Sequence, residues 1–88
     1  MTLNEVKVAL RVTGNADDAL LTRLLNSATA ECLRFTGLDA LDRNTEDDLW
    51  NGILVMIHAD YDADMKERNE YRRAAETLWM PYRTGMGI

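Results

Sequence analysis

The stretch "DDALLTRLLNSATAECLRFTG", residues 17–37, decides the fold of this 88-residue chain. Asp17 and Asp18 occupy its first turn, where carboxylates favour the positive end of a helix dipole. Gly37 stands at the position of a left-handed C-cap. The apolar residues between these ends form one wide stripe at helical spacing: Leu20, Leu21, Leu24, Leu25, Ala28, Cys32 and Phe35. The stretch therefore predicts a helix over residues 17–36 with one face in a core.

A shorter helix is predicted before this stretch. Thr2 and Glu5 match a capping box, in which the Thr2 hydroxyl accepts from the Glu5 backbone and the Glu5 carboxylate reaches back. Apolar residues then recur at helical spacing: Leu3, Val6 and Leu10, with Val12 just beyond. Gly14 and Asn15 predict a turn into the next helix.

A third helix is predicted after the segment "NTEDDLW", with Asn44 or Thr45 as its cap. Its apolar residues cover more than half of its circumference: Leu49, Trp50, Ile53, Leu54, Met56, Ile57 and Tyr61. This distribution predicts the central helix of a bundle. Gly52 lacks a side chain and permits a close helix crossing.

A fourth helix is predicted over residues 66–80, because Pro81 disfavours helical geometry at Met80. Its inner face carries Tyr71, Ala75, Leu78 and Tyr82. No segment alternates as a β-strand does. The sequence thus predicts an all-α fold, a small bundle of about four helices in one domain over residues 1–88, with residues 81–88 as a short tail.

Composition excludes several classes of protein. A lone cysteine, Cys32, excludes an intrachain disulfide, and a single histidine excludes a Cys/His zinc site. The aliphatic run at residues 53–57 is far shorter than the ~20 residues of a membrane span. The first residues lack a signal-peptide pattern. We expect a cytosolic protein without a membrane partner.

Charge is distributed unevenly along the chain, whose net charge is −5. Residues 39–64 contain eight acidic residues and one basic residue, a charge of −7, whereas residues 66–83 contain five basic and three acidic residues, a charge of +2. The net charge disfavours non-specific DNA binding. The asymmetry is compatible with head-to-tail contact between copies and equally with two solvated faces.

Candidate catalytic and metal-binding residues are few. Asp60, Asp62 and Asp64 match the first three ligands of a calcium-binding loop, but Met65 and Tyr71 stand where its glycine and bidentate glutamate belong. His58 and Asp62 share a helix face but lack an identified third ligand, and Cys32 lies within an apolar stripe. We expect no enzyme, no metal site and no cofactor.

Two interaction surfaces are considered. "YRR" on the last predicted helix is compatible with a helix-turn-helix DNA binder or a small regulatory module, although glutamates interleave with the arginines. Residues typical of interface cores gather near the end of the chain. The hypothesis for a subunit or portal interface comprises Trp79, Met80, Pro81, Tyr82, Arg83, Arg72 and Arg73. The alternative is that this segment closes the protein's own core.

The stretch "VKVALRVTGNADDALLTRLLNSATAECLRFTG", residues 6–37, resembles the head–tail connector (adaptor, or DNA-packaging) proteins of tailed double-stranded-DNA bacteriophages. The resemblance rests on a "VK..LR" first helix, an acidic turn, a Leu/Ala-rich helix and a closing "TG", and on "PYR" near the end. The matching residues are Val6, Lys7, Leu10, Arg11, Asp17, Asp18, Leu24, Ala28, Thr36, Gly37, Pro81, Tyr82 and Arg83. The charged "DADMKERNEYRRAAE" departs from the proline- and glycine-containing connection common in the family.

The resemblance implies a structural protein of the virion, assembled in the bacterial host cytoplasm. Such adaptors form a ring, typically of twelve copies, between the portal protein and the tail-side completion protein. The ring extends the channel through which DNA passes without specific binding. An acidic lining would repel phosphates, and the candidates for it are Asp39, Asp42, Glu46, Asp47 and Asp48.

Overall fold

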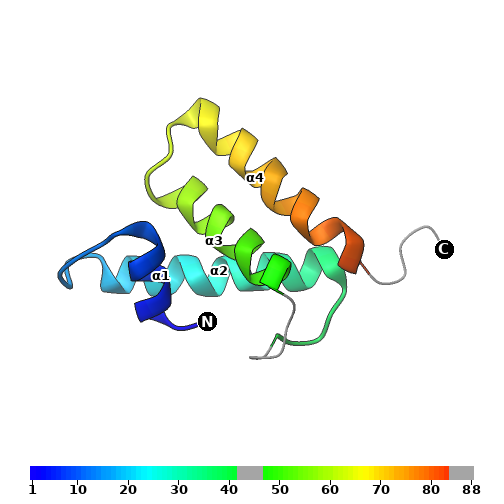
Figure 1. The fold of residues 1–88 in the computed structure, drawn as a ribbon, viewed down its shortest axis with the longest axis horizontal. Coiled ribbons are helices and arrows are strands. Elements are labelled where there is room, and N and C mark those ends of the chain that lie inside the picture. The colour runs from blue at the N-terminus through cyan, green and yellow to red at the C-terminus, as the bar shows by residue number, and fades with distance from the viewer. Residues whose placement is uncertain (42–46, 84–88) are drawn as a thin grey trace.

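The computed structural model describes residues 1–41 and 47–83. Within these ranges the elements are α1 (Leu3–Leu10), α2 (Asp18–Thr36), α3 (Asp47–Tyr61), α4 (Met65–Trp79) and a 3₁₀ helix, η1 (Met80–Tyr82). Figure 1 shows their arrangement. The described ranges contain four α-helices and no strand, which confirms the predicted all-α bundle.

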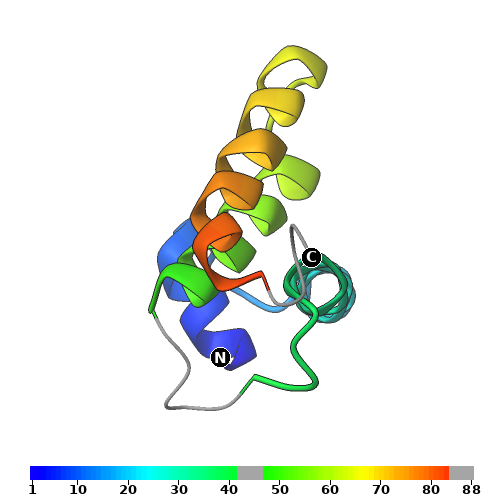
Figure 2. The ribbon, with the colours of Figure 1, turned by 90° about the vertical axis from the view of Figure 1, so that its right-hand side faces the viewer.

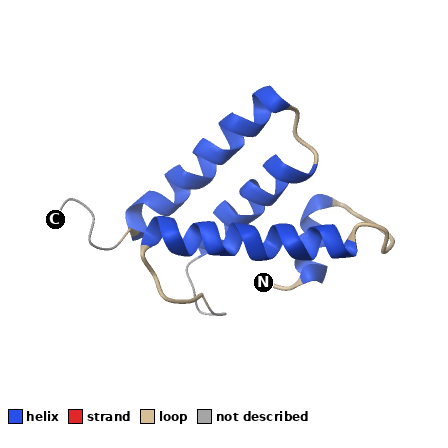
Figure 3. Ribbon diagram, turned by 180° about the vertical axis from the view of Figure 1, so that it is seen from behind, coloured by secondary structure: helices blue, strands red, loops and turns tan. Residues whose placement is uncertain are grey.

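Helices α3 and α4 form an antiparallel hairpin, and α2 crosses behind it (Figure 1). Both α2 and α3 contact the other three helices, whereas α1 and α4 do not contact one another within the described ranges. Seen from behind, α2 runs uncovered across the molecule (Figure 3). The central position predicted for the third helix is confirmed, and α2 shares it.

Two predicted caps, the capping box of the first helix and the glycine C-cap of the second, are confirmed. The Thr2 backbone donates to Glu5 Oε1 at 2.9 Å, and the Glu5 backbone donates to Thr2 Oγ1 at 3.2 Å, which completes the capping box. Gly37 ends α2 with φ of 80°, a conformation that glycine adopts without steric cost. The cap candidates Asn44 and Thr45 lie outside the described residues.

The last helix differs slightly from its predicted limits. It begins one residue earlier, because the Asp64 side chain caps it by accepting from the Glu67 backbone at 2.8 Å. This hydrogen bond lowers the pKa of Asp64. At the other end the helix tightens into η1, which contains Pro81. The first two residues of the predicted tail therefore belong to a 3₁₀ turn, and residues 84–88 lie outside the described ranges.

The core forms where α2, α3 and α4 meet, and Val6 of α1 joins it. Its fully buried apolar residues are Val6, Leu21, Ala28, Cys32, Leu49, Ile53, Met56, Ile57, Ala75 and Trp79. One predicted member is wrong: Leu20 is 42% exposed. Its neighbour Leu21 faces the core, and successive helical residues point about 100° apart. The apolar stripe of α2 is therefore narrower than the sequence indicates.

Hydrogen bonds to side chains fix the turn between α1 and α2. Asp17 does not cap α2 with its own side chain; its carboxylate instead accepts from Tyr61 Oη at 2.5 Å. Lys7 Nζ donates to the carbonyl of Gly14 at 2.6 Å and pairs with Asp18 Oδ1 at 2.7 Å. These contacts attach the beginning of α2 to α1 and to the end of α3.

The Tyr61–Asp17 contact predicts a loss of stability in alkali. The hydrogen bond to Asp17, followed by desolvation and the negative charges of Asp17 and Asp62, raises the pKa of Tyr61 above its ordinary value. The contribution is therefore fully present below about pH 10 and is lost as pH rises through the higher folded pKa. We expect urea unfolding to show a smaller alkaline loss of stability in Tyr61→Phe than in the wild type.

The control compares the two carboxylates. The difference in 295 nm absorbance between wild type and Tyr61→Phe isolates the titration of Tyr61. Asp17→Asn should lower the midpoint of the Tyr61 titration more than Asp62→Asn does. Asp17 accepts the hydrogen bond from Tyr61 and its charge has the larger influence on the pKa of Tyr61, whereas Asp62 acts through its charge alone. An unchanged midpoint in Asp17→Asn contradicts the assignment.

Candidate assembly surface

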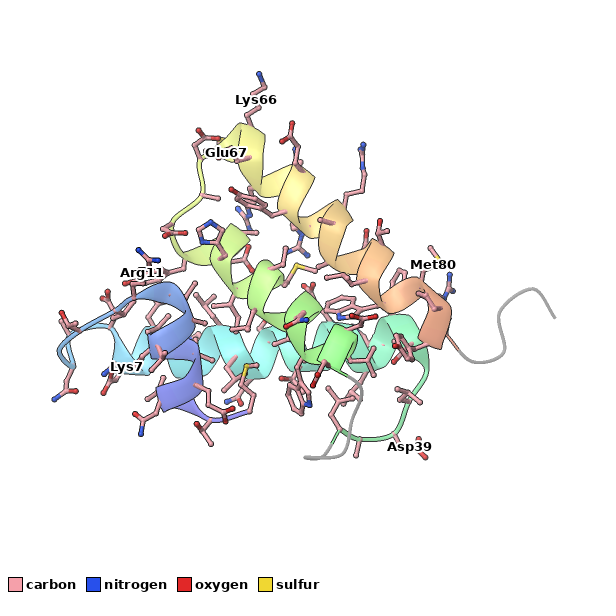
Figure 4. All side chains as sticks on the ribbon, viewed as in Figure 1. Lys7, Arg11, Asp39, Lys66, Glu67 and Met80 are labelled. Atoms are coloured by element: carbon pink, nitrogen blue, oxygen red, sulfur yellow. The ribbon has the colours of Figure 1, made fainter. Side chains whose placement is uncertain are left out.

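The predicted interface residues near the end of the chain lie where α2 and α4 end and α3 begins. Figure 4 shows Met80 and Asp39 at this same end of the molecule, away from Lys7 and Arg11. We call the exposed part of it, residues 80–83, the C-terminal edge. Met80, Pro81 and Arg83 are exposed there, and Tyr82 is half-buried.

Trp79 is not part of that exposed edge. It is only 1% exposed, its indole Nε1 donates to the Leu49 carbonyl at 3.1 Å, and its ring packs on Phe35 with centroids 5.9 Å apart. This placement corrects the expectation that Trp79 faces a neighbour. The indole fits because Gly52 leaves room: a Cβ there would lie 2.2 Å from Nε1. The close approach predicted at Gly52 is thus made by a side chain of α4.

The other residues of the C-terminal edge pack lightly on the helices beneath. Tyr82 Oη donates to Asp48 Oδ2 at 3.4 Å, and the Arg83 guanidinium lies 5.0 Å from the centroid of the Phe35 ring. Met80 is 43% exposed and leaves apolar surface uncovered. The edge thus combines an exposed methionine with an arginine held over an aromatic ring, residue types enriched in interface cores.

The two predicted arginines of α4 differ in their surroundings. Arg73 is exposed. Arg72 is half-buried, and its Nη2 donates to both oxygens of Glu31 at 3.0 Å while its Nη1 lies 3.5 Å from Asp60. Desolvation lowers the pKa of Arg72, but the hydrogen bond and charge of Glu31 and the charge of Asp60 outweigh it, and the net shift is upward. Arg72 therefore joins α2, α3 and α4 within the subunit.

The proposed channel-lining residues that the structure describes are exposed. Asp39 follows α2, and Asp47 and Asp48 form the first turn of α3, next to the C-terminal edge. Asp42 and Glu46 lie outside the described residues. The acidic candidates and the interface candidates thus lie at the same end of the molecule.

The acidic middle of the sequence does not form one acidic surface. Asp47 and Asp60 are 13 residues apart along α3, about 20 Å at the helical rise. Asp60 pairs with Arg68 at 3.0 Å and lies 3.5 Å from Arg72. Because α3 and α4 are antiparallel, part of the acidic segment is neutralised by the basic segment inside one subunit.

A groove that sequence reasoning missed runs along α3 beside α1, and α4 borders it only at its second half. Two hollows of about 590 and 460 Å³ share Asn51. The first is lined by Met1, Thr2, Glu5, Asp47, Trp50 and Asn51, and the second by Ala9, Leu10, Asn51, Leu54, Val55, His58 and Tyr71. We call the two together the α1–α3 groove. Its signal in the sequence is the apolar surface of α3, too wide to be covered by α2 and α4 alone.

The other chemical candidates lie apart from these surfaces or in their walls. His58 Nδ1 lies 2.5 Å from Asp62 Oδ1 and its ring packs on Tyr71, with centroids 4.8 Å apart. Cys32 is fully buried, and burial raises its pKa to about 11. Residues 1–41 and 47–83 contain no group of three or more His, Cys, Asp or Glu suited to a metal ion. No helix in the described part is long and apolar enough to cross a membrane.

The family model described as "Phage gp6-like head-tail connector protein" matches residues 1–78. The chain belongs to this head–tail connector family. The connector is thus a phage structural protein, and its family is not known to contain enzymes. Membership in the family implies a location at the head–tail junction of the virion and association with portal and tail proteins. No curated protein and no solved structure matches the chain. The match of the family model to this connector ends at residue 78, so it does not include the C-terminal edge.

Proposed function

We propose that this connector is one subunit of an oligomeric ring, typically of twelve copies, that joins the portal at the capsid vertex to the tail-side completion protein. The observation that carries the proposal is the family match over residues 1–78. Repeated heterologous contacts between identical subunits close into a ring when the rotation between neighbours closes. Residues 1–88 act as one helical domain in this ring, which assembles in the host cytoplasm.

The C-terminal edge, together with Arg73, contacts the portal or an adjacent subunit. The exposed Met80 supplies apolar area for the contact. Arg83 supplies a cation, and its guanidinium is held over the ring of Phe35. Trp79 stabilises this edge from beneath without touching the partner, because it is enclosed by its own helices.

Asp47 lines the hollow between α1 and α3 and is left to a contact between copies. The ring surrounds the extended DNA channel, and the other two described acidic candidates, Asp39 and Asp48, face it. Their exposure permits this role. Like charges repel the phosphates of passing DNA, so that DNA moves through without binding. The DNA-binding alternative has little support from the described residues: of the two arginines in "YRR", Arg72 is engaged by Glu31 and Asp60 of the same subunit, which leaves Arg73 as the exposed one.

The experiment compares two exposed methionines at opposite ends of α4. Met80→Asp should reduce ring formation or portal attachment by about tenfold or more, because it places a carboxylate in an apolar contact. Met65→Asp is the matched control, since Met65 is 87% exposed and lies outside the C-terminal edge. Mass photometry and negative-stain imaging of concentrated protein, alone and with portal, measure assembly, and circular dichroism checks folding.

Two results contradict the proposal in different ways. If both variants assemble as the wild type does, the C-terminal edge is not a contact. If the wild type forms no ring at any concentration, alone or with portal, the ring itself is wrong. Salt-dependent binding to duplex DNA would then favour the DNA-binding alternative.

A further inference from the structure

The α1–α3 groove leaves one side of the central helix without a partner. Its floor contains Trp50, Leu54 and Val55, all half-buried. The walls stand apart, because α1 and α4 do not contact one another in the described residues. Val8, which is 78% exposed, lines neither hollow but lies beside the first one, since it follows Glu5 by three residues on α1. A groove of this kind suits a helix laid along it.

The charged side chains along the groove are acidic, and the α-amino group of Met1 adds a cation to the first hollow. Its lining contains two carboxylates, Glu5 and Asp47, and neither lysine nor arginine. A helix that fits it should therefore carry cations and few acidic groups along one face.

The outer face of α2 has this character. It includes Ala19, Arg23, Asn26, Ser27, Ala30 and Arg34, which are exposed or half-buried. Neither arginine forms an ion pair within residues 1–41 and 47–83. The two acidic residues of α2 are engaged elsewhere, Asp18 by Lys7 and Glu31 by Arg72.

The groove and this basic face lie on opposite sides of the subunit. Helices α1, α2 and α3 contact one another pairwise, so the groove between α1 and α3 opens away from α2. Figure 2, in which α2 is seen end-on, shows α1 beside it and the α3–α4 hairpin above. A contact between opposite sides of identical subunits is heterologous and repeats from copy to copy.

We propose that the α1–α3 groove of one subunit binds the outer face of α2 of a second copy. Asp47 then receives an arginine of that face, and the exposed Leu20 at the end of α2 gains a cover. The inference rests on the proposed ring and specifies its copy-to-copy contact. With the groove as the contact between copies, the C-terminal edge is available for the contact with the portal.

Cross-linking between the centres of the two surfaces tests the contact. Asn51 lies where the two hollows meet, and Ser27 lies between Arg23 and Arg34, so the pair should meet whichever way the helix runs. The double variant Asn51→Cys, Ser27→Cys, treated with a short bis-maleimide under assembly conditions, should give a ladder of covalent oligomers. Each single variant should give a dimer at most. The native Cys32 is buried and protonated at neutral pH, so it should not react.

A second measurement uses charge. Asn51→Arg places a cation in the groove opposite the arginines of α2 and should weaken copy-to-copy association by about tenfold in mass photometry. Ala74→Arg, at an exposed position of α4, should not. The pair Asn51→Cys, Ala74→Cys is the matched control for the ladder.

The outcomes separate this inference from the proposed function. Rings without the 27–51 ladder overturn the groove contact and leave the ring intact. Cross-linking of the double variant that stops at dimers overturns the heterologous arrangement. If no assembly occurs even with portal present, the ring fails and the groove contact fails with it.

Discussion

Replacing Trp79 with alanine should lower the free energy of unfolding by about 3–5 kcal/mol, the usual cost of emptying a large aromatic site in a core. Trp79 is 1% exposed and lies between Phe35 and Gly52. Small domains have a total stability of only about 5–15 kcal/mol. Trp79→Ala should therefore leave this protein close to unfolding, which urea denaturation followed by circular dichroism will measure.

Two further variants separate the causes. Trp79→Phe keeps a ring but removes the indole donor to the Leu49 carbonyl. That carbonyl keeps its place in the backbone ladder of α3, so only the net value of one hydrogen bond, about 0.5–1.5 kcal/mol, is lost. Trp50→Ala, at a half-buried position in the α1–α3 groove, should cost clearly less than Trp79→Ala. Equal losses for Trp50→Ala and Trp79→Ala would show that Trp79 is not the central packing residue of this end.

The second large effect is expected for Gly52→Ala, which should destabilise the protein by about 1–3 kcal/mol through overpacking. The new Cβ would lie 2.2 Å from Trp79 Nε1, 2.7 Å from Cδ1 and 2.8 Å from Cε2. The indole is rigid, so relief requires that α4 shift or the ring turn. The result opposes intrinsic helix propensity, which favours alanine over glycine by about 1 kcal/mol in a helix interior.

The control for Gly52→Ala is its neighbour Asn51→Ala, which is exposed and should change stability little. A double-mutant cycle with Trp79→Phe identifies the cause, because the smaller ring should reduce the cost of the added methyl group. If Gly52→Ala stabilises the protein in the wild-type background, the overlap with Trp79 is not the dominant effect. Urea denaturation of all four proteins of the cycle provides the measurement.

Local features of the fold were predictable from the sequence. The capping box of Thr2 and Glu5 and the C-cap at Gly37 involve residues close in the chain, so local backbone geometry and the type of residue decide them. The apolar spacing likewise identified the helices and the central role of α3. The predicted acidic first turn of the third helix is confirmed at Asp47 and Asp48.

Contacts between helices were harder to predict. Trp79 follows the buried Ala75 by four residues, which is a signal for the inner face, but its position near the end of the chain suggested exposure. Arg72 follows Arg68 by the same spacing and lies against Asp60 and Glu31 on other helices. Partners so distant in the sequence depend on how the helices cross, which periodicity does not specify.

The candidate surfaces show the same division. Met80 and Arg83, two residues of the hypothetical interface, are exposed, and their contact with a partner stays a prediction. The α1–α3 groove was not predicted, because it exists only where α1 and α4 stand apart over α3.

The seating of the Trp79 indole on Gly52 ties the evolution of two positions that lie 27 residues apart in the chain. We expect a mutation that adds a side chain at position 52 to cost less stability once position 79 has accepted a smaller residue, and a later return to tryptophan to cost more. Related connectors should therefore carry either glycine at position 52 with tryptophan at position 79, or a different residue at both positions. A change at one position alone should seldom persist.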